Sequence, residues 1–487
     1  MNQPIVLTRG ALTAVSDGEV VAVYNSDSLT VSSLDTPLKI RSTKDLEAVL
    51  PASPGLRVVN RGSSRPPTPT FVPLLDRSQR HSLSRFTINI ANSCNLWCSY
   101  CYADHGTYHA PASLMSIEKA VQAAQRCLQL YPQIGTVQFF GGEPLLNSSA
   151  IDSVCMFFQH EAPGSLPEFV ATTNGTVLNE EILAILLRHN VGLTISVDGP
   201  AAIHDYLRPA KNGASSHAAI LQNVERLRSL GVRTDFECTY TLKHYELGIS
   251  VSDLLDYFAE EFDETSPHIS WAYLPQPTLA ADPGQRSTGV FRNDIAIQAQ
   301  QYLPVDLAAN LFRAAARKSM QNIAMRKGAA LTFVLGILKN LSTRAIAHAY
   351  CPAFNSQLSV AADGTVYPCF MFIGDPRMRM GNIFSDSFPN SEAGTLWERY
   401  VKEFGTRPTG TDAWYSALAS GCIAGDYITT GSLGDRIYER VQEAMIEEVL
   451  LGIVRYTQAP SLPQGGHVNG SRSREGSTSD TPRDTSR

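Results

Sequence analysis

The sequence predicts an α/β protein in which parallel strands alternate with outer helices, preceded by a small β-rich module. Three observations carry this prediction. Strand-like and helix-like segments alternate six times between residues 83 and 300, which is typical of a parallel sheet covered by helices. Residues 1–82 contain short alternating apolar segments instead. Cysteines gather near the start of the alternating region and again after it, which indicates metal or redox chemistry.

Composition and charge exclude several classes of protein. The chain has 487 residues, too many for one ordinary core, which predicts two or three domains. Its net charge is −6 and no run of lysine and arginine is present, so we expect no nucleic-acid partner. The sequence has no long apolar stretch and no signal peptide, which predicts no membrane partner and a cytoplasmic location. In a reducing compartment, nine cysteines indicate metal ligands or catalytic groups rather than disulfides.

Residues 1–82 predict the β-rich module. Residues 5–15 and 19–34 alternate apolar and polar side chains as strands do, and residues 42–50 follow with a helical pattern. Residues 63–73, "SSRPPTPTFVP", are rich in proline and serine and predict a linker or surface loop.

The alternating region, residues 83–300, places its glycine-, asparagine- and cysteine-rich stretches directly after strands. These stretches are "ANSCNLWC", "GGEP", "TTNGT" and "SVDGP". In a closed βα sheet, functional residues lie at the carboxyl ends of the strands. Periodicity leaves open whether this sheet closes fully, closes partly or stays open. The strands are expected at residues 85–91, 136–140, 167–175, 192–199, 233–242 and 268–274.

Three cysteines crowd the loop after the first of these strands. Cys94, Cys98 and Cys101 form the pattern C-x3-C-x2-C. Three thiolates can hold three irons of a [4Fe–4S] cluster and leave the fourth iron open. A zinc site would need a fourth ligand, for which His105 and His109 are near enough in sequence. An incidental redox pair in "CSYC" is the third possibility, and the spacing leaves all three open.

The surrounding motifs resemble those of the radical S-adenosylmethionine (radical SAM) superfamily. "FFGGEPLL", "TTNGT" and "SVDGP" come after the second, third and fourth strands, and "HDYLR" follows and ends at Arg208. These motifs lie between Arg85 and Leu242 in the order found in the peptide-modifying branch of that family. The resemblance implies a partial (β/α)6 barrel, a [4Fe–4S] cluster with an open iron site on Cys94, Cys98 and Cys101, and SAM as cofactor.

The same resemblance implies a set of residues around SAM. The GGEP motif would hold its methionyl ammonium group, with glycines that permit close backbone approach. A permanently charged arginine suits its carboxylate, and a strand-end serine suits its ribose. Asn174 would meet the cofactor or a strand-end amide, and Asp198 is as much a turn residue as a ligand. The expected cofactor-binding residues are Tyr100, Gly141, Gly142, Glu143, Pro144, Asn174, Ser196 and Arg208.

A second cysteine region begins at Cys351. Cys351 and Cys369 enclose Gly364 in the pattern C-x12-G-x4-C, which is similar to the opening of the C-terminal extension called SPASM, or of its shorter relative twitch. "ADGTVYP" predicts a hairpin with an Asp-Gly turn. Only Cys422 follows, so the resemblance implies one auxiliary iron–sulfur cluster on Cys351, Cys369 and Cys422 rather than two. The alternative is a vestigial fold that keeps two or three free cysteines.

These resemblances divide the chain into five expected parts. Residues 1–82 form the β-rich module, a possible docking element for peptide. Residues 83–300 form the barrel, residues 301–345 a helical connection and residues 346–457 the auxiliary-cluster domain. Residues 458–487 are poor in apolar side chains and predict a disordered tail.

The resemblance implies a maturase that cleaves SAM to a 5′-deoxyadenosyl radical and installs a thioether or carbon–carbon cross-link in a ribosomally made peptide. Its expected partners are a peptide or protein substrate and a reductant such as flavodoxin or ferredoxin. "CYADHGTY" is similar to stretches of such maturases. Formylglycine formation, as in anaerobic sulfatase maturation, and a non-catalytic metal-binding interaction protein are the alternatives. The sequence assigns no residue to catalytic proton transfer.

Overall fold

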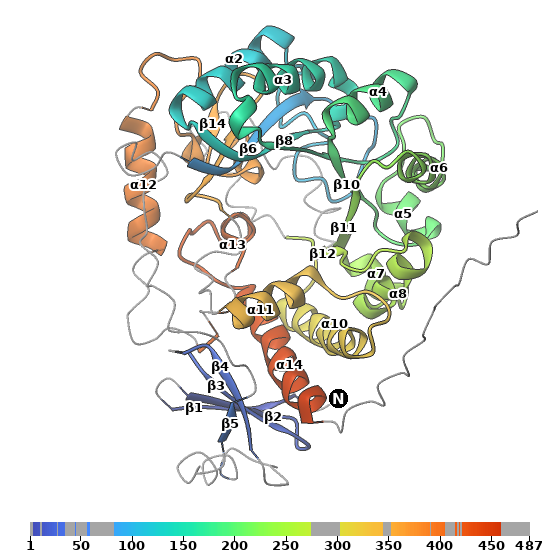
Figure 1. Ribbon diagram of the computed structural model, residues 1–487, viewed down its shortest axis with the longest axis vertical. Coiled ribbons are helices and arrows are strands. Elements are labelled where there is room, and N and C mark those ends of the chain that lie inside the picture. The colour runs from blue at the N-terminus through green and yellow to red at the C-terminus, as the bar shows by residue number, and fades with distance from the viewer. Residues whose placement is uncertain are drawn as a thin grey trace, which may run out of the picture.

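The computed structural model shows a barrel-like sheet ringed by helices above a small separate sheet (Figure 1). The structure describes the ranges given at the end of this paragraph and, outside them, four further residues: Lys44, Trp414, Tyr415 and Leu418. The predicted linker, Cys351 and all but the first residue of the predicted tail lie outside the described part. The described ranges are residues 3–9, 12–26, 28–34, 56–58, 82–273, 302–343, 352–389, 391–404 and 421–458.

The N-terminal module is a five-stranded antiparallel sheet in sequence order. Val15, Ala22, Tyr24 and Val31 are buried in the main core of the protein. The alternation predicted for residues 5–15 and 19–34 therefore produces an antiparallel sheet with one face against the rest of the molecule. Its strands are β1 (Ile5–Arg9), β2 (Leu12–Ser16), β3 (Val21–Asn25), β4 (Thr30–Leu34) and β5 (Leu56–Val58).

The barrel contains six parallel strands in the order β12-β11-β10-β9-β8-β6. Among the described strands this sheet is linear and β12 is its last strand on that side, so the predicted partial (β/α)6 barrel is confirmed. The strands are β6 (Ser82–Asn92), β8 (Gln133–Gly141), β9 (Glu168–Thr173), β10 (Gly192–Ser196), β11 (Thr234–Tyr240) and β12 (His268–Trp271).

Helices cover the outer face of this sheet (Figure 1). Their ends carry the expected capping residues: Asn179 accepts a hydrogen bond from the Ile182 amide at the start of one helix, and Ser250 and Asp253 form a capping box at another. Two short helices, α5 (Ala201–Leu207) and α7 (Leu242–Glu246), follow β10 and β11. The main outer helices are α2 (Ile117–Leu130), α3 (Ser148–Glu161), α4 (Glu180–His189), α6 (Ser216–Ser229) and α8 (Val251–Phe262).

The second cysteine region extends the barrel sheet on the side opposite β12. β13 (Gln357–Val360) pairs parallel with β6, and β14 (Val366–Tyr367) pairs antiparallel with β13. The predicted hairpin is therefore present, and Gly364 in its turn has a φ of 88°. The 3-10 turn η5 (Phe370–Phe372) follows, and its Phe370 ring lies 4.3 Å from that of Phe140 on β8.

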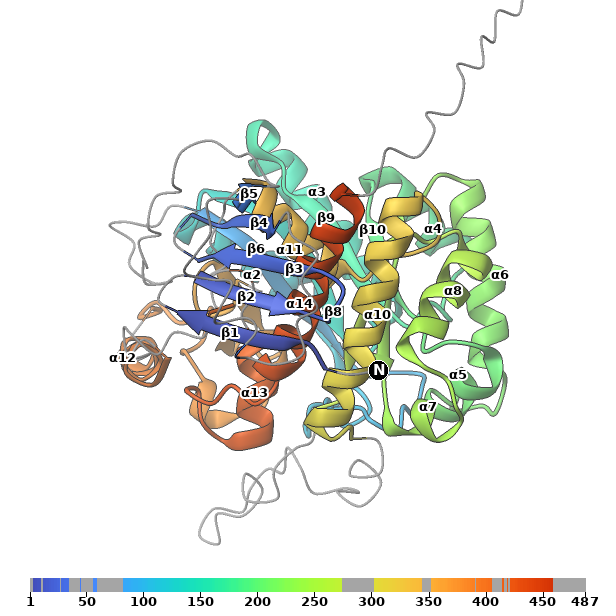
Figure 2. The same ribbon diagram turned by 90° about the horizontal axis from the view of Figure 1, so that it is seen from below.

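A long C-terminal helix connects two parts of the molecule. α14 (Glu439–Gln458) packs between the N-terminal sheet and α10 (Val305–Met325) (Figure 2). Arg317 on α10 donates to both carboxylate oxygens of Glu448 at 2.8 Å, and Arg455 forms an ion pair with Asp17. The remaining described helices are α11 (Thr332–Thr343), α12 (Ser391–Phe404) and α13 (Ile423–Thr430).

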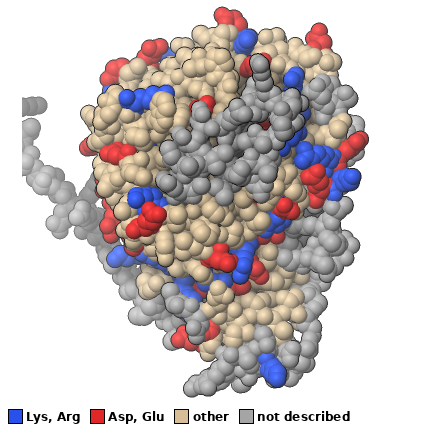
Figure 3. Space-filling view, turned by 180° about the vertical axis from the view of Figure 1, so that it is seen from behind, with Lys and Arg blue, Asp and Glu red and all other residues tan. Residues whose placement is uncertain are grey.

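The charged surface is mixed. On the face in Figure 3, basic and acidic side chains of the described residues are interspersed, and neither sign gathers into a large patch. Among the described residues, no helix is both long enough and apolar enough to cross a membrane.

Candidate cofactor site

The three-cysteine loop follows β6 at the carboxyl end of the barrel, and a neighbouring segment braces it. The Trp97 amide donates to the Pro209 carbonyl and the Ser99 amide donates to the Leu207 carbonyl, both at 2.9 Å. The Leu96 amide points at the Cys94 sulfur, 3.4 Å away. Backbone contacts to residues 207–209 and within the loop therefore hold the segment that carries Cys94, Cys98 and Cys101.

The stretch after Cys101 curls back around its thiol. Asp104, His105, Gly106, Tyr108 and His109 all have positive φ values. Burial raises the pKa of the Cys101 thiol, while the amides of Ala103, His105 and Gly106 oppose that effect. Backbone amides directed at a sulfur stabilise its thiolate form. The "ADHGTY" stretch thus forms part of the support of the cysteine loop.

Burial also keeps the other two thiols protonated in the absence of a cation. It raises the pKa of Cys94 to about 11, with a further contribution from Glu143. It raises the pKa of Cys98 well above its usual value, although the Arg208 guanidinium acts in the opposite direction. Buried thiols of this kind become thiolates when they bind metal. Three thiols on one braced loop fit three corners of an iron–sulfur cluster.

The two histidines considered as a fourth zinc ligand contact other side chains. Within the described ranges, no group of three or more His, Cys, Asp or Glu side chains is arranged to hold a single metal ion. One zinc ion requires all its thiolates within about 2.3 Å, whereas a cluster takes each thiolate on a different iron. His105 lies against the Trp97 ring at 4.4 Å, and His109 pairs with Asp104 at 3.4 Å.

The GGEP loop at the end of β8 lies directly against the cysteine loop. A Cβ on Gly142 would lie 2.3 Å from the Ser93 carbonyl oxygen, and one on Gly106 would lie 2.5 Å from the Gly142 Cα. Gly141 has a φ of 146°, and a Cβ there would lie 2.4 Å from the Ala91 oxygen. Glycine is therefore required for these backbones to meet.

Glu143 is fully buried and already holds three hydrogen bonds. Its Oε1 accepts from the Leu145 amide at 2.9 Å and the Thr173 hydroxyl at 2.7 Å, and its Oε2 accepts from the Asn174 amide at 2.8 Å. Burial raises the pKa of Glu143 to about 7, and these donors oppose the rise. A carboxylate has about four acceptor positions, so one remains at Oε2. Pro144 begins the 3-10 turn that follows.

Asn174 and Ser196 bind neighbouring strand ends. The Asn174 amide nitrogen donates to the Asn95 side-chain oxygen at 2.8 Å, and its oxygen accepts from the Thr176 amide at 3.0 Å. The Ser196 hydroxyl donates to Glu237 at 2.7 Å. Both predicted residues lie at the carboxyl ends of β9 and β10: Asn174 connects the cysteine loop to the end of β9, and Ser196 connects β10 to β11.

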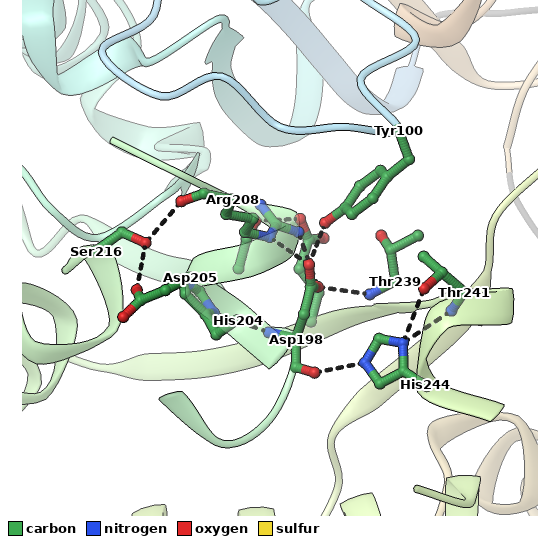
Figure 4. Close-up of polar contacts among 11 residues, drawn as sticks. Tyr100, Asp198, His204, Asp205, Arg208, Ser216, Thr239, Thr241 and His244 are labelled. Carbon is green, nitrogen blue, oxygen red and sulfur yellow. Dashed lines mark hydrogen bonds and ion pairs between the residues drawn. The ribbon is translucent and has the colours of Figure 1, made fainter. Parts of the chain in front are cut away.

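Asp198 joins the cysteine loop to Arg208 (Figure 4). Arg208 donates from Nε to Oδ2 of Asp198 at 2.8 Å and from Nη2 to Oδ1 at 3.2 Å. The Tyr100 hydroxyl also donates to Oδ2, and the Thr239 amide donates to Oδ1 at 3.1 Å. Burial raises the pKa of Asp198, but Arg208 more than offsets this, and the pKa lies below its usual value. Asp198 is therefore ionised.

The predicted auxiliary cysteines lie at the starts of two short helical segments. Cys369 is buried and precedes η5, whereas Cys422 precedes α13 and accepts from the Gly425 amide at 3.4 Å. The two segments pack together, with the Phe372 and Tyr427 rings 5.6 Å apart. Cys351, the third predicted ligand, lies outside the described residues.

Two family models match the chain. The model for the radical SAM superfamily matches residues 88–246, which include the cysteine loop, GGEP, Asp198 and Arg208. This chain contains a radical SAM domain. The model for the SPASM iron–sulfur cluster-binding domain matches residues 351–395. The radical SAM domain implies a [4Fe–4S] cluster and SAM, and the SPASM domain indicates an auxiliary iron–sulfur cluster.

Curated relatives match mainly over the radical SAM region. A serine-type anaerobic sulfatase-maturating enzyme of Bacteroides thetaiotaomicron is 30% identical over 165 residues, 31% of this chain and 40% of that protein. The radical SAM cyclopropyl synthase TigE of Paramaledivibacter caminithermalis is 26% identical over 152 residues, 28% of this chain and 31% of that protein. The chain spans half or less of the length of the first curated relatives that it matches.

A solved structure confirms the fold over a larger part of the chain. "Native anSMEcpe with bound AdoMet" superposes with a TM-score of 0.60 and covers 76% of this chain and 98% of that chain. At 18% sequence identity, this likeness shows the fold alone.

Sequence reasoning gave no role to three polar residues of this site, of which His204 and His244 are buried and Glu237 is partly buried. Glu237 accepts a hydrogen bond from the Ser196 hydroxyl, and His204 and His244 form hydrogen bonds with the Asp198 backbone. His204 lies in "HDYLR", but a motif match assigns no partner to it. The contacts join β10 to β11, α5 and α7, so only the folded chain reveals them.

Proposed function

We propose that this protein is a radical SAM maturase that installs a thioether or carbon–carbon cross-link in a ribosomally made peptide. One observation carries the proposal: the carboxyl ends of β6, β8 and β10 bring a three-thiol loop, GGEP and a buried Asp198–Arg208 pair together. When bound and reduced, the cluster and SAM supply a 5′-deoxyadenosyl radical that abstracts hydrogen from an unactivated carbon.

The residues of this chain have separate proposed roles in that reaction. Cys94, Cys98 and Cys101 hold the cluster and leave one iron for SAM. Glu143 accepts from the SAM ammonium group at its remaining position, and Arg208 binds the SAM carboxylate. Ser196 meets the ribose, and Asn174 fixes the loop beside Cys94, whose sulfur lies 3.7 Å from the Asn174 amide nitrogen.

The proposed peptide substrate has a docking edge in the N-terminal module. Among the described strands, β1 pairs with β2 alone, so its outer edge carries backbone groups that an extended peptide can join as a further strand. The proposed auxiliary cluster on Cys351, Cys369 and Cys422 takes an electron from the substrate radical or binds substrate. A flavodoxin- or ferredoxin-like protein supplies the electron for the first cluster.

Release of 5′-deoxyadenosine tests the proposed chemistry. The protein is purified without oxygen, reconstituted with iron and sulfide, reduced with dithionite and incubated with SAM. We expect 5′-deoxyadenosine from the wild type and none from Cys98→Ala. Cys127→Ala is the matched control, because Cys127 is a buried cysteine on α2 away from the site. If wild-type protein with a full first cluster released no 5′-deoxyadenosine, the radical reaction would be refuted and only a non-catalytic metal-binding role would remain.

A second candidate reaction is oxidation of a serine or cysteine side chain to formylglycine. The matched sulfatase-maturating enzyme favours it. Oxidation of serine and formation of a cross-link both remove two hydrogen atoms, so peptide mass alone does not separate them. A hydrazide that reacts with aldehydes labels formylglycine only. Labelling of the product would favour the second candidate over the cross-link.

A further inference from the structure

The backbone N–H and C=O of Asp198 each contact a buried histidine, and the two histidines belong to different helices (Figure 4). The Asp198 amide donates to Nδ1 of His204 at 3.1 Å, and Nε2 of His244 lies 2.6 Å from the Asp198 carbonyl oxygen. His204 belongs to α5 and His244 to α7, and neither side chain is exposed. The backbone of Asp198 is therefore fixed on both sides at a strand-to-helix turn.

The contacts assign one proton position to each ring. Because Nδ1 of His204 accepts from an amide, its proton is on Nε2. Nδ1 of His244 accepts from the Thr241 amide at 3.0 Å, so its proton is also on Nε2, which donates to the Asp198 carbonyl. Burial lowers the pKa of both rings, and that of His204 falls to about 4. Both histidines are neutral at physiological pH, as these contacts require.

The Asp198 carboxylate has no acceptor position left for a ligand. Its two oxygens accept hydrogen bonds from Nε and Nη2 of Arg208, from the Tyr100 hydroxyl and from the Thr239 amide. These four hydrogen bonds fill its four acceptor positions. Its contribution is therefore to orient other groups. Arg208 lies four residues after His204 along α5 and its neighbouring turn, so both side chains reach the same aspartate.

We infer that His204 and His244 are positioning residues for SAM: they fix the Asp198 peptide so that its carboxylate aligns Arg208 and Tyr100 beside the cysteine loop. The inference rests on the proposed role of Arg208 in binding the SAM carboxylate. The Arg208 guanidinium lies 5.3 Å from the centre of the Tyr100 ring, and Tyr100 precedes Cys101. A shift of the Asp198 backbone therefore moves both the arginine and the cluster loop.

Equilibrium dialysis with isotopically labelled SAM tests this inference on reconstituted protein with a full first cluster. His204→Ala and His244→Ala each remove one hydrogen bond to Asp198, and we expect SAM to bind about tenfold more weakly in each. His204→Asn keeps an acceptor near the Nδ1 position, and His244→Gln keeps a donor near the Nε2 position. We expect both conservative variants to bind SAM within about twofold of the wild type.

His189→Ala is the control for loss of a buried histidine. His189 contacts Asp152 and Gln159 at the end of α4, away from Asp198. Its replacement should lower the melting temperature and leave SAM affinity unchanged. Wild-type affinity in folded His204→Ala and His244→Ala would overturn the inference. If the alanine variants do not fold, a conservative variant with the wild-type melting temperature but at least tenfold weaker binding would overturn it. No binding to the wild type would overturn the proposed function itself.

Discussion

The two cysteine regions differ in how the chain supports them. The first, with Cys94, Cys98 and Cys101, lies on one loop and is braced by backbone pairing, close glycine contacts and the buried Asp198–Arg208 pair. In the second, Cys369 and Cys422 precede two short helical segments, η5 and α13, that are far apart in sequence and pack together.

This difference shows what each site depends on. In the first region, local backbone geometry sets the cysteine spacing, so a small steric change there should abolish the site. In the second, the two cysteines lie on segments that only the tertiary packing of η5 on α13 holds side by side. The second site should therefore be lost without damage to the first.

The largest expected effect is the loss of the first cluster in Gly142→Ala. The new Cβ would lie 2.3 Å from the Ser93 oxygen, so the GGEP and cysteine loops must separate. We expect a loss of about 3 kcal/mol in stability, less bound iron and no 5′-deoxyadenosine release. Gly164→Ala is the control, because a Cβ there meets nothing within 4 Å. Wild-type iron content in Gly142→Ala would show that the two loops need not touch.

The next effect concerns the second region alone. Cys422→Ala should lower the iron content and abolish conversion of the peptide substrate, while 5′-deoxyadenosine release continues at a rate near that of the wild type. Iron analysis, product chromatography and peptide mass spectrometry measure these three quantities. Loss of SAM cleavage in this variant would mean that the two sites are not independent.

Low pH should lower the folding stability of the part of the barrel around His204, next to the first cysteine region. His204 has an ordinary pKa of 6.5 that burial lowers to about 4, so below pH 6.5 the unfolded chain binds more protons. Stability from the neutral ring is present above pH 6.5 and is lost as the pH falls towards 4, by about 2 kcal/mol at pH 5. Hydrogen exchange of β10 and β11 peptides should report this loss. His204→Asn should remove it, and an unchanged acid dependence in that variant would refute the assignment.

For α14, in the C-terminal part of the chain, we expect the opposite pH dependence: its stability should fall as the pH rises. Burial raises the pKa of Glu447 from 4.5 to about 7, and Arg313 opposes the rise. The folded state binds the extra proton here, so stability is present at low pH and is lost as the pH rises from 4.5 to 7. Between pH 5 and 7 the loss is about 2 kcal/mol. Hydrogen exchange of α14 measures it, and Glu447→Gln should abolish this dependence.

The smallest effect is expected away from both sites. Asn179→Ala removes the hydrogen bond that caps the start of α4 and should cost about 1 kcal/mol of stability. Urea denaturation should detect this change, whereas iron content and SAM affinity should stay at wild-type values. Loss of iron in this variant would show that the first site is less locally determined than its contacts indicate.

The sequence predicted the parts of the molecule that depend on local patterns. Six strands, the C-x3-C-x2-C loop and the GGEP turn are each specified by residues close together in the chain. The need for Gly106 opposite Gly142 was not predictable, because that contact joins two loops. The same holds for β13, which pairs with β6 across most of the chain.

The role of Asp198 could not be predicted for a related reason. An aspartate before a glycine after a strand fits a turn and a ligand equally well. The decision depends on His204, His244, Arg208 and Tyr100, which reach Asp198 from three other segments. Hydrophobic periodicity carries no information about which buried polar groups will meet.

The electron paramagnetic resonance spectrum of reduced protein, recorded before and after addition of SAM, tests the central claim most directly. The claim is that the braced loop of Cys94, Cys98 and Cys101 holds the cluster that binds SAM. SAM should change the signal of one cluster in the wild type and in Cys422→Ala, and no such change should occur in Cys98→Ala. A spectrum that SAM leaves unchanged in wild-type protein with a full first cluster would contradict the claim.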